Sequence, residues 1–204
     1  MKRSAHVQTS SAPDLTAAAR AIEAFLGALG HPTDSDPELA ATGQLVAAAF
    51  HDELLAGYRM DPARILVDTI ATRSHAMVVV RDIDVVCICP HHLLPSTGVV
   101  HVGYLPNERI VGFGAIAQLA RGFAQRLTLQ ETLCERVADA LVQHLGAVAA
   151  GCIADLSPAC LTCRGTRPSQ ARVVTYAVSG RMQHDADLRR EFLGLAGVNM
   201  EPSR

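Results

Sequence analysis

Two cysteines and two adjacent histidines lie close together in the stretch "CICPHH", which runs from Cys87 to His92. Thiolate and imidazole are ligands that suit Zn²⁺, and a catalytic zinc ion takes three protein ligands and a water. Cys89 and His92 have a Cys-x-x-His spacing that could supply two of these ligands. The third must come from elsewhere, and spacing alone leaves Cys160 and Cys163 of "CLTC" undecided.

The other cysteines favour a simpler interpretation, because a lone cysteine is more often a small buried apolar residue than a ligand. Cys134 falls in a helical pattern and Cys152 in an apolar strand pattern, so both are expected in the core. Cys87 shares the strand face of Cys89, and we expect no role for it in the site. His91 stands beside a ligand without being needed as one, so it is a candidate for proton transfer. The alternative for His91 is a supporting or surface imidazole.

Hydropathy patterns predict an α+β fold in which two pairs of strands flank two central helices. Residues 14–29 form a helix with Asp14 as its N-cap and Gly30 as its stop, and residues 38–57 form a second helix. The first strand has a bulge near Asp82. The elements expected after residue 74 are two strands, two helices, two strands and a closing helix, at 75–89, 97–105, 114–127, 129–146, 147–156, 171–180 and 185–197.

The chain thus divides into a disordered tail at 1–13, an N-terminal helical segment at 14–73 and a catalytic domain at 74–204. Of the 204 residues, 49% are hydrophobic, which is enough for a core without disulfide staples. The open edges of a sheet built from hairpins favour a ring-like homo-oligomer.

Composition excludes several classes of protein. A net charge of -2 gives no basic field for nucleic acid, and no apolar run is long enough to span a membrane. The N-terminus lacks the apolar stretch of a secretory signal. The six cysteines are spread along the chain, which favours a reducing cytoplasm over a disulfide scaffold. Lys2 is the only lysine, so an anion would be bound by arginine, histidine or backbone N–H groups.

From about Arg81 to Leu195 the sequence resembles the GTP cyclohydrolase I family. "CPHHLLP" resembles the Cys-Glu-His-His segment of that family, and "FAQRLTLQETL" carries its Ala-x-Arg-x-x-x-Gln-Glu pattern. The segments "GYLPNERIVGF", "CLTCRG", "RVVTYAVSG" and "REFLGL" continue the resemblance. It implies the tunnelling fold, with core order ββααββ, and a toroidal homodecamer of two pentamers with active sites at subunit interfaces.

The resemblance also implies roles for particular residues. Cys89, His92 and Cys160 hold zinc, since the cysteine of the family lies four residues before the matched arginine, here Arg164. His91 matches a histidine that transfers protons. The residues that match substrate-binding positions are Glu131 and Gln130 for the guanine edge and Arg164 for phosphate. The reaction of the family hydrates C8 of the guanine ring, opens the imidazole ring and releases formate.

The chain departs from the family where phosphate would bind. Ala115, Gln118, Leu45 and Ala48 replace four cationic side chains. Pro158 stands where the family has a second proton-transferring histidine. An apolar, closed wall around Ala115, Gln118 and Leu45 would indicate a substrate without phosphates, whereas arginines there would indicate GTP.

The leading hypothesis is therefore a zinc-dependent cyclohydrolase that acts at C8 of a guanine-type heterocycle without a triphosphate, such as a base, a nucleoside or a pterin-like compound. One alternative is an ordinary GTP cyclohydrolase I that makes dihydroneopterin triphosphate for folate or pterin synthesis. The other is a non-catalytic sensor of a purine or pterin. No nucleic acid or membrane partner is expected.

Overall fold

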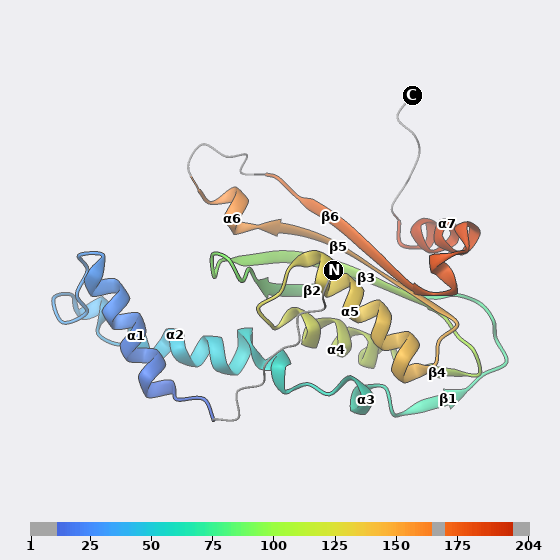
Figure 1. Ribbon diagram of the computed structural model, residues 1–204, viewed down its shortest axis with the longest axis horizontal. Helices are drawn as coiled ribbons and strands as arrows, with labels where there is room; N and C mark the ends of the chain where they lie inside the picture. The colour runs from blue at the N-terminus through green and yellow to red at the C-terminus, as the bar shows by residue number, and fades with distance from the viewer. Residues whose placement is uncertain (1–11, 165–169, 198–204) are drawn as a thin grey trace. The chain divides into compact units, whose positions relative to one another are not determined.

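The computed structural model describes residues 12–164 and 170–197, which form two compact units that divide between Glu53 and Leu54 (Figure 1). The division falls inside the predicted helical segment at 14–73. The tail predicted at 1–13 lies almost wholly outside the described residues. Among the helices described, none has the length and apolar character needed to cross a membrane.

The first unit begins with helix α1, Leu15–Ala28, as predicted. The carboxylate of Asp14 accepts a hydrogen bond from Ala17 N–H at 2.9 Å, which satisfies one of the free donors at the helix start. Gly30 follows the helix with φ of 88°, a left-handed conformation that glycine adopts without strain. Helix α2, Thr42–Ala49, packs against α1.

The single helix predicted at 38–57 is wrong in detail. Only α2 is a regular α-helix there, between a 3₁₀ turn at Pro37–Leu39 and a π-helical turn at Phe50–Leu54. A further 3₁₀ turn, Ala56–Arg59, belongs to the second unit. Gly57 N–H donates to the carbonyl of Gln125 rather than to a helical partner, which explains why the helix stops.

The second unit is built on a four-stranded antiparallel sheet with strand order β2-β3-β5-β6 (Figure 1). Helices α4 and α5 lie between the two strand pairs in the chain, so the predicted order ββααββ is confirmed. The bounds of these elements are β2 Val78–Ile88, β3 Pro95–Leu105, α4 Phe113–Ala124, α5 Gln130–Ala140, β5 Ala149–Pro158 and β6 Val173–Gly180.

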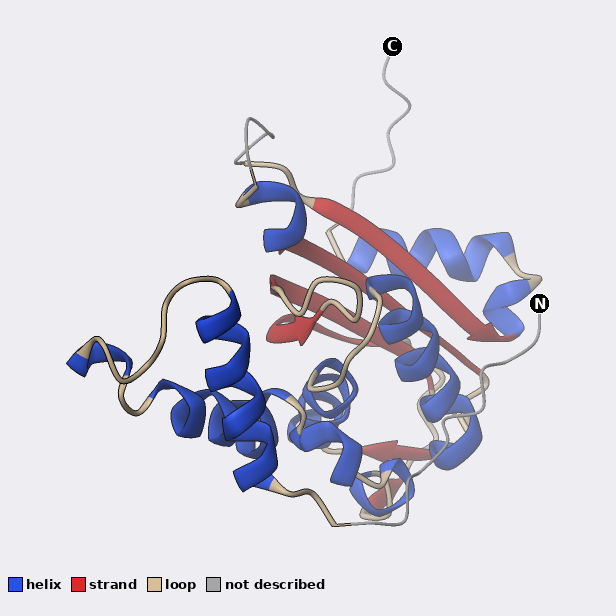
Figure 2. Ribbon diagram, turned by 60° about the vertical axis from the view of Figure 1, so that its left-hand side comes forward, coloured by secondary structure: helices blue, strands red, loops and turns tan. Residues whose placement is uncertain are grey.

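The two faces of the sheet are covered differently (Figures 1 and 2). Helices α4 and α5 bury the main core on one face, where Cys134 and Cys152 are both fully buried as predicted. Helix α7, Ala186–Leu195, covers part of the other face. The ring of Phe192 lies so close to β3 and β5 that a Cβ on Gly103 or Gly151 would come within 2.6 or 2.5 Å of it.

The bulge predicted near Asp82 is confirmed. The register between β2 and β3 shifts between Val80 and Ile83, and Asp82 has φ of 56°. Its backbone N–H donates to Nδ1 of His101 at 3.1 Å, which gives the unpaired residue a partner on the neighbouring strand.

Several short elements have no counterpart in the prediction. Strands β1, Thr69–Ala71, and β4, Arg109–Val111, pair as a separate antiparallel ribbon. Helices α3, Pro62–Ile65, and α6, Ala159–Thr162, have four residues each. Segments this short contain too little periodicity to be recognised from sequence.

Candidate metal centre

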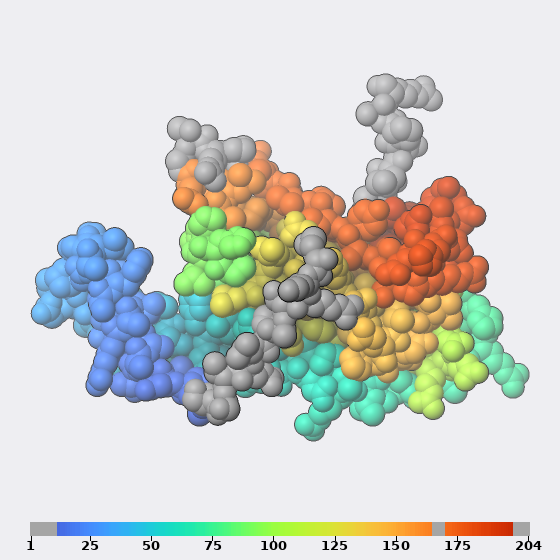
Figure 3. Space-filling model, viewed as in Figure 1, coloured from blue at the N-terminus to red at the C-terminus, as the bar shows by residue number. Residues whose placement is uncertain are grey.

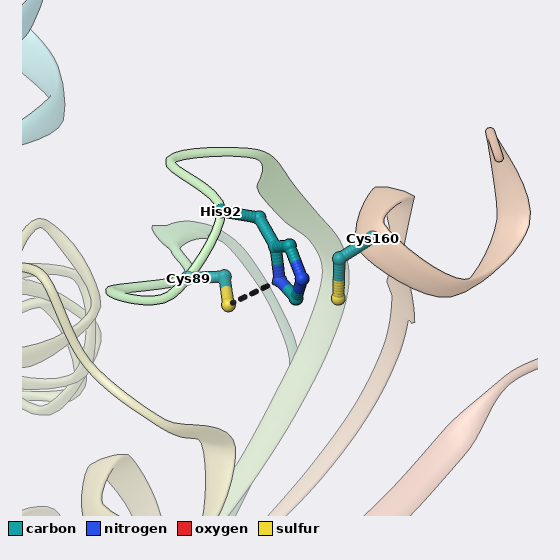
Figure 4. A group of neighbouring side chains, drawn as sticks. All are labelled: Cys89, His92 and Cys160. Atoms are coloured by element: carbon teal, nitrogen blue, oxygen red, sulfur yellow. Dashed lines mark hydrogen bonds between the residues drawn. The ribbon is translucent and has the colours of Figure 1, made fainter.

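Cys89, His92 and Cys160 come together at one end of the sheet (Figure 4). One potential ligand atom from each side chain lies within 4.8 Å of the other two. Within 12–164 and 170–197, no other three histidine, cysteine or acidic side chains meet this criterion. The structure thus assembles the three residues that the resemblance implied as metal ligands.

A tight turn after β2 brings the first two ligands together. Cys89 N–H donates to the carbonyl of Leu94, and Leu93 N–H donates to the carbonyl of Cys89, both at 2.9 Å. Leu93 has φ of 54°, a conformation that non-glycine residues adopt rarely and that allows the chain to reverse here. As a result, Nδ1 of His92 lies 3.7 Å from Sγ of Cys89.

The third ligand arrives from the end of β5. Pro158 pairs with Ser96 at the start of β3, which follows directly after the turn that carries His92. Helix α6 begins after Pro158, whose carbonyl accepts a hydrogen bond from the Thr162 hydroxyl at 3.2 Å. Cys160 lies in this helix, whereas Cys163 follows it, is exposed and does not join the group.

The geometry and chemistry of the three side chains fit Zn²⁺. Tetrahedral zinc with usual bond lengths separates a sulfur from a nitrogen ligand by roughly 3.5 Å, close to the distance between Cys89 and His92. Burial and the nearby charge of Cys89 raise the pKa of the Cys160 thiol. Two thiolates so close together repel each other, and a divalent cation between them would remove this cost.

His91 and Glu131 lie at the same end of the sheet. The ring of exposed His91 is perpendicular to that of His92, with centroids 6.3 Å apart, so neighbouring residues direct their imidazoles differently. Thr128 N–H donates to the carbonyl of Ile88 at 3.1 Å, which brings the start of α5 beside the turn. Figure 3 shows the turn in green next to α6 in orange and the start of α5 in yellow. Glu131 is exposed in the first turn of α5.

Two other residues expected to bind substrate have different surroundings. Arg164 lies near the metal centre, where its charge opposes the rise in the pKa of Cys160. The amide of Gln130 faces the sheet and donates to the carbonyls of Ala154 and Val173. Cys87 is buried, and burial raises the pKa of its thiol to about 11, which agrees with a role in packing.

A cavity of about 1040 Å³ lies near the start of α4. Its lining includes Ala115 and Gln118, together with the exposed side chains of Arg59 and Arg64. Sequence reasoning missed these two arginines because they belong to no recognisable motif. Arg121, three residues after Gln118, does not line this cavity, and its Nε donates to the carbonyl of Asp84 on β2.

The cavity and the metal centre lie toward opposite ends of α4. The chain leaving the C-terminal end of this helix runs beside Ile88, one residue before Cys89. The helix has 12 residues, so its first residue is roughly 17 Å from its last. Leu45 and Ala48 belong to the first unit of the structure.

Fold and site together define an α+β protein in which two cysteines and a histidine form a candidate metal site at one end of an antiparallel sheet. Residues 18–197 match the family model described as GTP cyclohydrolase I. GTP cyclohydrolase 1 of Chromobacterium violaceum is 37% identical over 88% of this chain and 87% of its own length. The enzyme of the same name from Ralstonia nicotianae is 38% identical over 85% and 82%, and that from Campylobacter lari 39% over 70% and 75%. The chain belongs to the GTP cyclohydrolase I family.

Proposed function

We propose that this chain is a zinc-dependent GTP cyclohydrolase I that hydrolyses the guanine ring of GTP at C8. The observation that carries the proposal is the meeting of Cys89, His92 and Cys160 at the sheet end where the first turn of α5 carries Glu131. Family membership and the names of the relatives support the same activity.

Each residue has a chemical task in this proposal. Zinc held by Cys89, His92 and Cys160 would act as a Lewis acid that activates water for attack on C8. The Glu131 carboxylate accepts hydrogen bonds from N1–H and the N2 amino group of guanine, a pair of donors that adenine lacks. Each carbon–nitrogen bond that breaks at C8 leaves a nitrogen that needs a proton, and His91 delivers it.

The cavity favours GTP over the substrate without phosphates that the sequence suggested. Arg59 and Arg64 line the same open cavity as Ala115 and Gln118, where a closed apolar wall would have indicated a neutral substrate. A charge-assisted hydrogen bond contributes about 1.5–3 kcal/mol, so two arginines offset part of the missing cations. Asp61 and Asp68 also line the cavity, so phosphate binding requires direct contact with the guanidinium groups.

The separation of cavity and metal centre supports an oligomeric enzyme. One chain does not bring the two together, so we propose that the cavity of one copy faces the metal centre of a second copy. The decamer of two pentamers implied by the resemblance fits this arrangement. Mixing an Arg59→Gln/Arg64→Gln variant with a Cys160→Ser variant, with subunit exchange, is expected to restore part of the activity that each lacks. Absence of any recovery in verified mixed oligomers would contradict a shared site.

A base, nucleoside or pterin-like substrate is the second candidate, because Ala115 and Gln118, which the resemblance aligns with cationic residues of the family, line the cavity. Steady-state kinetics with GTP, guanosine and guanine on zinc-loaded protein separate the two candidates. We expect kcat/KM for GTP to exceed that for guanosine by at least about a hundredfold, the effect of about 2.7 kcal/mol of phosphate binding. Equal or better turnover of guanosine would favour the second candidate.

A further inference from the structure

Gln130, the first residue of α5, uses both of its amide hydrogens within the protein. Nε2 donates to the carbonyl of Ala154 at 2.9 Å and to the carbonyl of Val173 at 2.6 Å. Both partners are acceptors only, so the nitrogen must face them, since the flipped amide would place oxygen against oxygen. The side chain therefore has no N–H left to offer to a ligand.

The two carbonyls belong to neighbouring strands that lead to the metal centre. Ala154 is in β5, which ends at Pro158 just before Cys160, and Val173 is the first residue of β6. Gln130 thus connects the start of α5 to two strands, at residues that lie 24 and 43 positions after it in the chain. One turn later, the thiol of Cys134 lies 3.8 Å from the carbonyl of Thr175 and extends the contact between α5 and β6.

We propose that Gln130 is a positioning residue that fixes the first turn of α5 on the sheet and thereby directs Glu131 toward the guanine edge. This role rests on the proposed function and differs from the direct contact with substrate that the resemblance suggested. Because Gln130 acts through Glu131, its contribution to binding disappears when the Glu131 carboxylate is absent.

A double-mutant cycle tests this dependence on the zinc-loaded enzyme. The probe is 8-oxo-GTP, which keeps the N1–H and N2 amino edge but already carries oxygen at C8. Gln130→Glu places carboxylate oxygens against two carbonyl oxygens and is expected to weaken binding by about tenfold or more in the wild-type background. In the Glu131→Gln background the same change is expected to weaken binding by less than about threefold. An equal loss in both backgrounds would overturn the proposal, because it would indicate independent contact with the ligand.

The pH dependence gives a second readout. The introduced carboxyl faces two carbonyl groups, which raises its pKa, and its protonated form can donate one of the lost hydrogen bonds. The affinity of Gln130→Glu relative to wild type should therefore rise as the pH falls from 8 to 6. A ratio that stays constant over this range would contradict the role. Gln143→Glu, at an exposed position in the π-helical turn Leu141–Leu145, is the matched control and should bind as wild type does.

Two further comparisons keep the result interpretable. Gln130→Met removes both donors without adding charge. It replaces Gln130→Glu in the double-mutant cycle if Gln130→Glu does not fold. Wild-type enzyme that neither binds 8-oxo-GTP nor releases formate from GTP would refute the proposed function itself, and this role with it. Wild-type binding with additive losses would refute only the positioning role.

Discussion

Sγ of Cys89 lies 3.7 Å from Nδ1 of His92, on a turn that two backbone hydrogen bonds and the left-handed Leu93 hold closed. The separation is close to that of two ligands on one zinc ion. The turn thus holds two candidate metal ligands close together, and β5 adds the third candidate by bringing Cys160 to the same sheet end.

Zinc content distinguishes Cys160 from Cys163. A serine hydroxyl is a much poorer zinc ligand than a thiolate, so Cys160→Ser should lose most of its bound zinc and its activity. Cys163→Ser is the matched control, because Cys163 is exposed and outside the ligand group, and it should keep both. The measurement is zinc per chain by mass spectrometry after gel filtration. Zinc loss from Cys163→Ser alone would reverse the assignment.

His91 and His92 should differ in what their loss removes. His91→Gln is expected to keep zinc but to lower kcat by about 10²–10⁴-fold, the usual contribution of a positioned acid or base. His92→Gln should lose zinc as well as activity, since Nδ1 of His92 faces the sulfur of Cys89. Zinc content and kcat are measured on the same preparations. If His91→Gln retains wild-type kcat, another group delivers the proton.

The arginines of the cavity should act on the phosphates of the substrate. Arg59→Gln and Arg64→Gln are each expected to raise KM for GTP by about tenfold or more, from the loss of about 1.5 kcal/mol or more. KM for guanosine should not change. Arg190→Gln removes an exposed arginine paired with Asp187 on α7 and serves as the control. A parallel rise in KM for both substrates would show that these arginines do not recognise phosphate.

The fold itself depends on the contact between α7 and the sheet. Phe192 is fully buried against Gly103 and Gly151, so Phe192→Ala should lower the free energy of unfolding by about 3–5 kcal/mol. Leu195→Ala, at a position 49% exposed in the same helix, should cost much less. Chemical denaturation at one fixed protein concentration compares the two. Similar losses for both variants would mean that α7 does not pack as described.

Local sequence patterns predicted most of the second unit. The alternation of apolar residues predicts the strands. The bulge at Asp82 was predictable because the alternation breaks there. Cys89 and His92 were recognisable because they are three residues apart on one turn. The choice of Cys160 over Cys163 was not predictable from spacing, because it depends on the register that pairs Pro158 with Ser96. The resemblance to the family supplied it.

Features that depend on packing between distant segments could not be predicted. Arg59 and Arg64 line the same cavity as Gln118 only in the folded chain, so no local pattern indicates that they share it. The hydrogen bonds of Gln130 reach strands 24 and 43 positions further on. A single sequence contains no signal for such contacts. It also does not show that the cavity and the candidate metal ligands lie toward opposite ends of α4 in one chain.

Formate release from the guanine ring tests the central claim most directly. The zinc-loaded enzyme is incubated with GTP labelled with ¹³C at C8, and the products are followed by NMR. The account predicts that labelled formate appears in a one-to-one ratio with GTP consumed and that chelating the zinc abolishes it. GTP that binds but keeps its labelled C8 in the ring, with zinc verified in the site, would contradict the account.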